Sequence, residues 1–221
     1  MATRRVVEER QSAVRALASA DDIRTAVTAL RRACPTMRRL HDLVGDPPLR
    51  RQAAGFKGLA SIVVAQQLSA ASAAAIWRRT VGVVKPFQPE VMAALSDAEL
   101  RGAGLSRPKV RTLRAVSEAV IDGTLDFKRL RHASDADLRE ALTAVSGIGP
   151  WTADIYVMFC LGRPDAFAPG DLALQLSAQS AFSLKSRPDA SEIEALAERW
   201  RPWRSVAALL LWSYYAHDRK R

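Results

Sequence analysis

The sequence is poor in cysteine and has no long apolar run. Its 221 residues include only Cys34 and Cys160, which lie far apart in the chain. Two such cysteines provide no disulfide framework and favour a reducing compartment. No stretch approaches the apolar length of a membrane span, and the charged segment after Met1 is unlike a secretory signal peptide. We therefore expect a cytoplasmic protein that does not enter a membrane.

Common catalytic signatures are also missing. The chain contains no phosphate-loop pattern, no Gly-x-Ser-x-Gly and no His-Glu-x-x-His. Its histidines, His41, His132 and His217, lack the spacing of metal ligands. The sequence therefore gives no sign of a nucleotide-hydrolysing loop, a serine-hydrolase elbow or a zinc-peptidase helix.

Acidic residues are outnumbered by basic ones. The chain has 33 lysines and arginines against 23 aspartates and glutamates, a formal net charge of +10 at pH 7. A strongly basic chain is a candidate for binding a polyanion. The alternative is the basic, solvated surface of a protein from an arginine-rich proteome, and charge alone does not decide between the two.

Helical periodicity runs through most of the chain, whereas strand signals are sparse. Apolar residues recur at the spacing i, i+3, i+4, i+7 in two clear segments. These are Phe56, Leu59, Ala60 and Val63, and then Val110, Leu113, Val116 and Val120 after Pro108. Ser96 and Glu99 have the spacing of a capping box. We expect a chain that is helical nearly throughout.

A glycine-rich hairpin separates two of the expected helices. The first begins at the capping signal of Ser134, and the second begins at Pro150, which suits a first helical turn. Gly147 and Gly149 permit backbone angles that other residues resist. Backbone amides before a helix N-terminus attract an anion without reading a base. The alternative is a plain helix–turn–helix corner in which Ile148 plugs the core.

Three separated motifs resemble the helix-hairpin-helix DNA glycosylases. They are FKGLASIVVAQQLSAASAAAIW, LTAVSGIGPWTAD followed by FAPGD, and AERWRPWRSVAALLLW. The resemblance runs from roughly Leu40 to Tyr215 and is greatest to the bacterial 3-methyladenine DNA glycosylase II group. It implies an all-α, helix-hairpin-helix glycosylase fold with two helical lobes around a cleft. In that family the hairpin binds a phosphate beside a flipped-out nucleotide.

The same resemblance suggests a domain organisation. A central helical bundle with the hairpin is expected over residues 55–163. A flanking helical lobe is expected to combine residues 31–54 with residues 164–221. Residues 1–30 are expected to form a charged, helical N-terminal extension. Asp171 would then lie where the two lobes meet.

Asp171 is the candidate catalytic residue. It follows Pro169 and Gly170, twenty residues after Trp151, and it matches the family's catalytic acid. Breaking an N-glycosidic bond builds positive charge on the sugar, which a carboxylate can stabilise while it orients or deprotonates a water molecule. Its place before LALQLSAQ also suits a helix N-cap, and the two roles can coexist.

Two other acids are weaker candidates. Asp165 lies in Gly-Arg-Pro-Asp, a turn in which its side chain is expected to bond to its own backbone. Asp154 is expected on the helix after the hairpin, where it would fix the local architecture. Neither matches the family's catalytic position.

An aromatic substrate pocket is expected from Trp151, Trp212 and Ile155. Trp151 stands where relatives that also cut the DNA backbone carry a Schiff-base lysine, so the resemblance implies base removal without lyase activity. Its indole could stack on a flipped base, although a core residue is the alternative. Trp212 matches the family's second aromatic position. Ile155 stands where many relatives have a tyrosine, and Tyr156 beside it points about 100° away on a helix.

The remaining DNA contacts are expected at the hairpin and at one loop. The backbone of Gly147, Ile148 and Gly149 would approach the phosphate. By position, Gln67 would fill the gap left by the flipped nucleotide, with Leu68 the alternative if the loop is shifted by one residue. The other interpretation of these two residues is an ordinary exposed helix end.

No cofactor is expected. Some relatives hold an iron–sulfur cluster on four cysteines after the catalytic acid, and no cysteine follows Cys160. A monovalent cation could still bind backbone carbonyls of the hairpin, as in relatives, with Val145 and Gly147 as the candidates.

The combined pattern predicts a monofunctional DNA N-glycosylase that flips out and excises alkylated purines of the 3-methyladenine and 7-methylguanine type. It would leave an abasic site in base-excision repair, acting as a monomer on damaged double-stranded DNA of the bacterial nucleoid. The alternatives are a glycosylase of the same fold for another damaged base and a non-catalytic helix-hairpin-helix DNA-binding module. Asp171 argues against the module because phosphate binding does not need an acid there.

Overall fold

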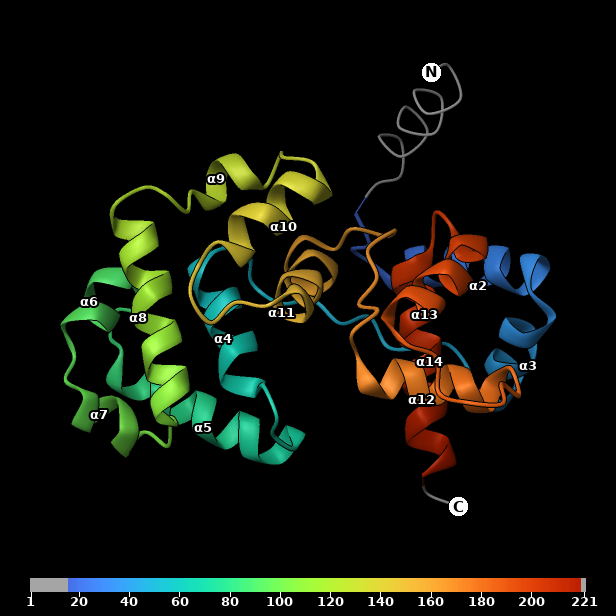
Figure 1. Cartoon of the computed structure of the whole chain (residues 1–221), viewed down its shortest axis with the longest axis horizontal. Coiled ribbons are helices and arrows are strands. Elements are labelled where there is room, and N and C mark those ends of the chain that lie inside the picture. Colours follow the sequence, from blue (N-terminus) through green and yellow to red (C-terminus); the bar gives the residue numbers. More distant parts are fainter. Residues whose placement is uncertain (1–15, 220–221) are drawn as a thin grey trace. The chain divides into compact units, whose positions relative to one another are not determined.

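The computed structural model describes residues 16–219, and every regular element in this range is helical (Figure 1). The expected all-α fold is therefore confirmed. The elements are α2 (Ala20–Ala33), α3 (Pro35–Val44), α4 (Phe56–Ala65), α5 (Ala70–Val83), α6 (Pro89–Ala94), α7 (Asp97–Gly102), α8 (Arg107–Ile121), α9 (Phe127–Leu130), α10 (Asp135–Thr143), α11 (Pro150–Ile155), the π-helix η1 (Tyr156–Leu161), α12 (Leu172–Ala181), α13 (Ala190–Ala197), the 3-10 helix η2 (Glu198–Trp200) and α14 (Arg204–Asp218).

The chain divides into two compact units. One is Gln52–Cys160, here called the hairpin unit. The other combines the chain up to Arg51 with the chain from Leu161 onward, here called the terminal unit. Of the expected extension over residues 1–30, residues 1–15 lie outside the described residues. Within the described part, α2 belongs to the terminal unit and packs against α3 and α14. The domain boundaries expected from the resemblance stay predictions.

The hairpin unit is a bundle organised around α4 and α8. Helix α8 packs against α4, α6 and α7, and α4 also packs against α5 and α11. The apolar residues expected at helical spacing form much of the core: Phe56, Leu59, Ala60 and Val63 on α4, and Val110, Leu113 and Val116 on α8 are buried. Each such large side chain contributes about 1.5–3 kcal/mol on burial. The hairpin helix α11 is therefore held on a well-packed support.

Two helix starts in this unit have the capping geometry that the sequence predicts. The Ser96 hydroxyl accepts a hydrogen bond from the Glu99 amide, and Glu99 Oε2 accepts one from the Ser96 amide at 2.8 Å. Ser134 caps α10, where its hydroxyl accepts a hydrogen bond from the Asp137 amide at 3.1 Å. These caps satisfy amides that have no partner within the helix.

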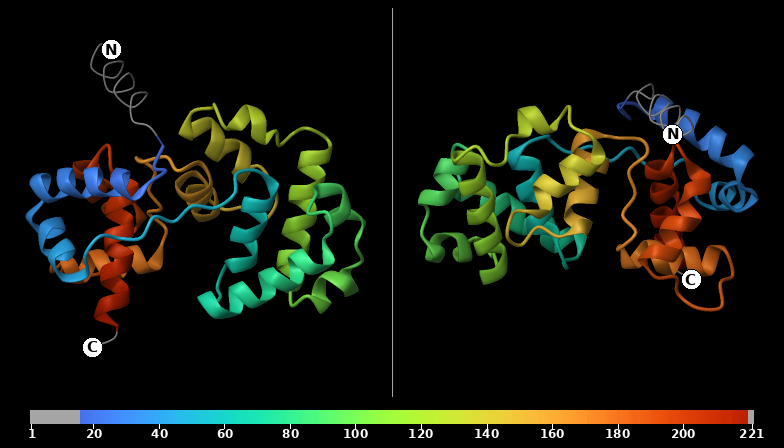
Figure 2. Two further views of the ribbon diagram at one scale, coloured as in Figure 1. Left: turned by 180° about the vertical axis from the view of Figure 1, so that it is seen from behind. Right: turned by 45° about the horizontal axis from the view of Figure 1, so that its top comes forward.

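The terminal unit is organised around α14, which packs against α2, α3 and α12 (Figure 2). Its apolar run from Val206 to Leu211 is buried, as expected for a core helix. None of the helices between residues 16 and 219 combines the length and apolarity that a membrane crossing requires. The buried run fixes α14, so the residue that follows it, Trp212, has a defined place.

Candidate functional site

The hairpin turn is closed by its own backbone and by one buried side chain. The Ile148 amide donates to the Val145 carbonyl at 3.0 Å, and the Ile148 side chain is 5% exposed. Gly147 has a φ of 87°, and a Cβ at this residue would lie 2.0 Å from Thr112 Oγ1. Glycine is therefore required at Gly147 by both conformation and space. The Ile148 side chain is buried in the core beneath the turn, so only its backbone can take part in binding an anion.

Gly149 differs from Gly147 in what surrounds it. It is the N-cap of α11, with an extended φ of −95°, and a Cβ there would meet no heavy atom within 4 Å. The conformation does not require glycine. The open space beside Gly149 lies at the start of α11, where Pro150 occupies the first turn and the helix amides have no partner within the helix.

An ion pair joins the two helices of the hairpin. Arg139 of α10 donates through Nε to the carboxylate of Asp154 on α11, which is 5% exposed. Because a buried carboxylate needs such a partner, this pair supports the architectural role expected of Asp154.

The loop between α4 and α5 carries the expected wedge residues and contacts the hairpin. Gln67 is exposed and has a φ of 57°, which is uncommon for a residue other than glycine. Leu68 is 38% exposed. The neighbouring Gln66 donates through Nε2 to Thr152 Oγ1 of α11 at 2.7 Å. The hairpin unit thus brings the loop of Gln67 and Leu68 to the helix that begins at the hairpin.

The expected pocket residues of the hairpin unit differ in exposure. Trp151, in the first turn of α11, is half-buried, whereas Ile155 is only 6% exposed. Tyr156 is 1% exposed, and its hydroxyl accepts a hydrogen bond from the Gly55 amide at 2.8 Å. Burial raises the pKa of Tyr156 to about 12, against the smaller opposing effect of the Gly55 hydrogen bond. Tyr156 is therefore a structural residue that joins the π-helix to the start of α4.

Asp171 and Trp212 form a hydrogen-bonded pair in the terminal unit. Asp171 Oδ1 accepts hydrogen bonds from the Leu174 amide and from Trp212 Nε1, each at 3.0 Å. The first contact makes Asp171 the N-cap of α12, as the sequence suggested. The second fixes the carboxylate against α14, 41 residues further along the chain. The two contacts together set the direction in which this side chain points.

A cation lies over the ring of Trp212. The Arg50 guanidinium carbon is 5.9 Å from the ring centroid, within the range of a cation–π interaction. No local pattern distinguishes Arg50 from the many other arginines, because this contact joins residues far apart in the chain. The half-buried indole therefore has one edge bonded to Asp171 and one face that attracts positive charge.

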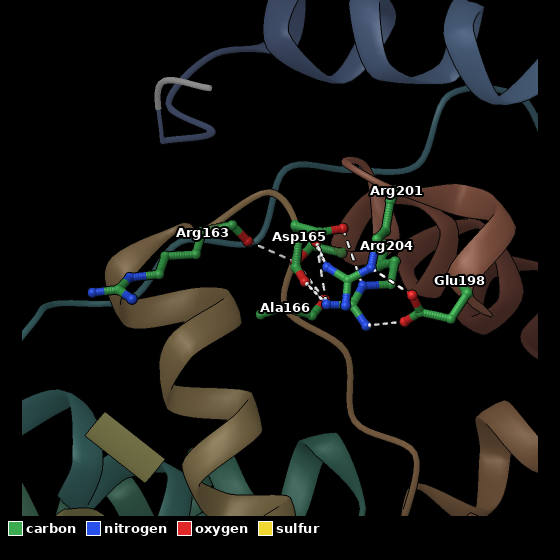
Figure 3. A network of polar contacts seen from close by, with 7 residues as sticks. Arg163, Asp165, Ala166, Glu198, Arg201 and Arg204 are labelled. Carbon is green, nitrogen blue, oxygen red and sulfur yellow. Dashed lines mark hydrogen bonds and ion pairs between the residues drawn. The ribbon is translucent and has the colours of Figure 1, made fainter. Parts of the chain in front are cut away.

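The segment before Asp171 is anchored to the start of α14 (Figure 3). Asp165 Oδ1 accepts from Arg204 Nε at 3.0 Å, the Asp165 backbone carbonyl accepts from Arg204 Nη2 at 2.8 Å, and Arg201 also pairs with the Asp165 carboxylate. Glu198 Oε1 accepts from Arg204 Nη1 at 3.0 Å. The expectation that Asp165 bonds mainly to its own backbone is wrong, because these arginines supply stronger, charge-assisted donors.

The same anchor includes backbone contacts of Ser205. Its amide donates to the Pro164 carbonyl at 2.9 Å, and its hydroxyl oxygen lies 2.7 Å from the carbonyl oxygens of both Arg163 and Ala166. In Figure 3 the Arg163 side chain points away from the network. Residues 163–166 are thereby fixed to the helix that carries Trp212, which restrains the loop leading to Asp171.

Among residues 16–219, no group of three or more His, Cys, Asp or Glu side chains is placed to hold a metal ion. The cation expected at Val145 and Gly147 would use backbone carbonyls instead. One lone pair of the Val145 carbonyl is engaged by the Ile148 amide, and a carbonyl oxygen has a second.

Comparison with known proteins gives a consistent result. A family model described as "HhH-GPD superfamily base excision DNA repair protein" matches residues 60–202. The putative DNA-3-methyladenine glycosylase YfjP of Bacillus subtilis is 35% identical over 125 residues. That match covers 57% of this chain, and the chain spans 44% of the length of that relative.

Two solved structures cover most of the chain. A DNA-3-methyladenine glycosidase from Bacillus halodurans is 32% identical, with a TM-score of 0.76, and the match covers 89% of this chain and 91% of that one. The 3-methyladenine DNA glycosylase Mag1 of Schizosaccharomyces pombe, solved with abasic DNA, is 27% identical with a TM-score of 0.79. That match covers 85% of this chain and 95% of Mag1.

Proposed function

Because the chain belongs to the HhH-GPD superfamily of base excision DNA repair proteins, we propose that it is a DNA glycosylase that excises alkylated purines and leaves an abasic site. Its partner is double-stranded DNA with a damaged base, which it binds as a monomer in the bacterial nucleoid. The observation that carries the proposal is the Asp171 carboxylate, fixed by the Leu174 amide and the Trp212 indole at 3.0 Å each.

The chemistry assigned to Asp171 is electrostatic stabilisation. Cleavage of the N-glycosidic bond places positive charge on the sugar, and a fixed carboxylate beside the anomeric carbon lowers the energy of that state. The same group orients or deprotonates the attacking water. The Leu174 amide and the Trp212 indole both donate to Oδ1, so these two hydrogen bonds orient the carboxylate.

Alkylated purines fit the aromatic residues of the proposed pocket. Purines alkylated at ring nitrogens are positively charged, and an indole face attracts a cation. The Arg50 guanidinium over Trp212 supports this use of the ring, since a cation already lies on it. Such purines are also good leaving groups, so the proposed reaction needs no general acid on the base. Trp151 and Ile155 are also assigned to substrate binding, as the family resemblance implies.

Lyase activity is not proposed. Strand cleavage by this family's bifunctional members needs a lysine at the position of Trp151, where the amine forms a Schiff base with the sugar. Trp151 lacks that amine. The product is therefore an intact strand with an abasic site.

The proposed contacts with DNA are made by the hairpin unit. Gly147, Ile148 and Gly149 offer backbone groups to a phosphate, and the open space beside Gly149 supports a close approach. The backbone carbonyls of Val145 and Gly147 would hold a monovalent cation, whose charge would favour a phosphate nearby. Gln67, or Leu68 if the loop shifts, is assigned to the gap left by the flipped nucleotide.

One assay tests the proposal against its alternatives. The protein is incubated with methylated duplex DNA, and the released bases are identified by mass spectrometry. Release of 3-methyladenine and 7-methylguanine is the expected result. Release only from DNA with oxidised or deaminated bases would point to another substrate of the same fold. Binding of damaged duplex without release of any base would indicate a non-catalytic module.

A further inference from the structure

Lys109 joins the first turn of α8 to the end of α4. Its Nζ donates to the carbonyl oxygens of Val64 at 2.7 Å and of Gln66 at 2.8 Å. The last carbonyls of a helix have no partner within the helix and carry partial negative charge. An ammonium group at this place satisfies both carbonyls and stabilises the point at which α4 ends.

The residue that follows these carbonyls has an unfavourable backbone conformation. Gln67 has a φ of 57°, and a left-handed residue other than glycine persists only where its surroundings hold it there. The Leu68 amide donates to the Ala65 carbonyl at 3.3 Å, which closes a turn that needs a positive φ at Gln67. Two further contacts hold the residue before it: the Lys109 bond to the Gln66 carbonyl and the Gln66 side-chain bond to Thr152. Lys109 and Thr152 thus hold the residue before Gln67 from two different helices.

Lys109 is partly withdrawn from water to make these contacts. Desolvation lowers the pKa of its ammonium group. A lysine that only offered its charge to a distant phosphate would extend into solvent. The half-buried position indicates that the two carbonyls, and not solvent, are its main partners.

We propose that Lys109 is a positioning residue that holds the loop of Gln66 to Leu68 so that Gln67 can enter the DNA stack when a nucleotide flips out. The inference rests on the proposed glycosylase function. A wedge is useful only in duplex DNA, where extrusion of a base leaves a gap opposite its partner. In a single strand the damaged base is already unpaired, so the loop has no gap to fill.

The test compares one methylated base in two settings, a duplex and a single strand of the same sequence. Single-turnover excision is measured for the wild-type protein, Lys109→Met, Lys109→Gln and Lys109→Arg. Methionine keeps roughly the length of the side chain without a donor. Glutamine keeps one amide donor group, and arginine keeps the charge and several N–H donors. Arg107→Met, on the exposed first residue of the same helix, is the charge-matched control.

The expected result is a loss confined to the duplex. Lys109→Met should lower duplex excision about tenfold, on the order of the loss of hydrogen bonds from a charged group, while single-strand excision stays within about twofold of wild type. The duplex excision rate of Lys109→Gln should lie between those of wild type and Lys109→Met. Lys109→Arg should keep most of the wild-type duplex rate. Arg107→Met should leave the ratio of duplex to single-strand rates unchanged. Fluorescence of 2-aminopurine opposite the lesion should report less base flipping for Lys109→Met.

Equal losses on both substrates, or no loss on the duplex, would overturn the positioning role. An equal loss would mean that Lys109 acts through global stability or through overall charge. A wild-type protein that releases no methylated base from either substrate would instead overturn the proposed function, which separates the two claims.

Discussion

At the residue scale, substitutions can separate the Trp212 hydrogen bond to Asp171 from the base stacking that we propose for its ring. Trp212→Phe keeps a flat ring but removes the Nε1 donor to Asp171. We expect it to lower alkylpurine excision about tenfold, the effect of one lost hydrogen bond to a charged group. Trp212→Ala should lower excision further, because stacking of a base on an aromatic ring is worth roughly 1–3 kcal/mol.

Both variants should bind undamaged duplex almost as well as wild type, since no flipped base is stacked there. Fluorescence anisotropy and single-turnover excision measure the two properties. Trp77→Phe is a matched control, because Trp77 packs on Phe87 in the hairpin unit. Normal excision by both Trp212 variants would show that the indole is only a core residue.

The residue at position 151 decides the expected product. Because Trp151 cannot form a Schiff base, borohydride added during the reaction should trap no covalent protein–DNA adduct, and the strand should stay intact until alkali is added. A denaturing gel with labelled DNA shows both. An adduct in good yield would mean that another amine acts as the nucleophile.

The sequence predicts the N-cap role of Asp171, which the structure confirms, but not its contact with Trp212. The spacing behind the hairpin marks the acid, and Pro169-Gly170 marks the N-cap. The Trp212 hydrogen bond, the Arg50 contact and the Arg204 pair with Asp165 all join residues far apart in the chain. Local sequence patterns carry no information about such partners, because these contacts form only when the helices pack together.

At the scale of the elements, the two glycines of the hairpin have different roles. Gly149 has an extended conformation with open space around a Cβ. We therefore expect Gly149→Val to fold with a melting temperature close to wild type. It should nevertheless bind both damaged and undamaged duplex much more weakly, because the side chain occupies the space through which a phosphate would approach.

Gly147→Ala is the opposite case. Its Cβ would overlap Thr112, and its φ of 87° is unfavourable for alanine. It should destabilise the protein by roughly 1–3 kcal/mol, measurable by thermal melting. Unchanged DNA affinity in a folded Gly149→Val protein would contradict the assignment of the hairpin to phosphate binding.

Most elements were predictable because their signals are local. The capping residues Ser96 and Ser134 and the apolar period of α4 and α8 lie within single helices. Two features were not. The helix after the hairpin continues from Tyr156 as a π-helix, and apolar spacing does not distinguish that hydrogen-bond pattern. Helix α8 begins at Arg107, before Pro108, since proline is accepted in the first turn.

At the scale of the whole molecule, the burial of Tyr156 makes the free energy of unfolding decrease as the pH becomes alkaline. Burial raises the pKa of Tyr156 to about 12, above the ordinary value of 10.0. The folded state therefore holds this proton more tightly than the unfolded state. The contribution of this proton to the free energy of unfolding is fully present below pH 10 and is lost as the pH rises towards 12.

Urea unfolding at pH 9 and pH 11 should reveal this loss, which amounts to about 1 kcal/mol for each unit of pH in that window. Tyr156→Phe should be less stable at neutral pH, since the Gly55 amide loses its acceptor, but it should lose less stability between the two pH values. Tyr215→Phe, at a half-buried tyrosine of the terminal unit, is the control. Identical pH dependence of wild type and Tyr156→Phe would contradict the buried, protonated phenol.

The fold as a whole was predictable to the level of an all-helical chain and a family. Helical periodicity indicated an all-helical chain, and the basic charge indicated a candidate for binding a polyanion. The three motifs identified the superfamily whose model matches residues 60–202. The apolar pattern does not mark the division at Cys160, because η1 continues α11 across it.

The central claim is that the Asp171 carboxylate drives excision of alkylated purines, and a single substitution tests it most directly. Asparagine can still cap α12 and accept from Trp212 through its carbonyl oxygen, so Asp171→Asn should fold normally. Single-turnover release of 7-methylguanine and 3-methyladenine from one methylated duplex is measured for wild type and Asp171→Asn at equal DNA occupancy. We expect the variant to bind the duplex as tightly as wild type and to release base at least about 100-fold more slowly. Near-normal release by the folded variant would contradict the claim.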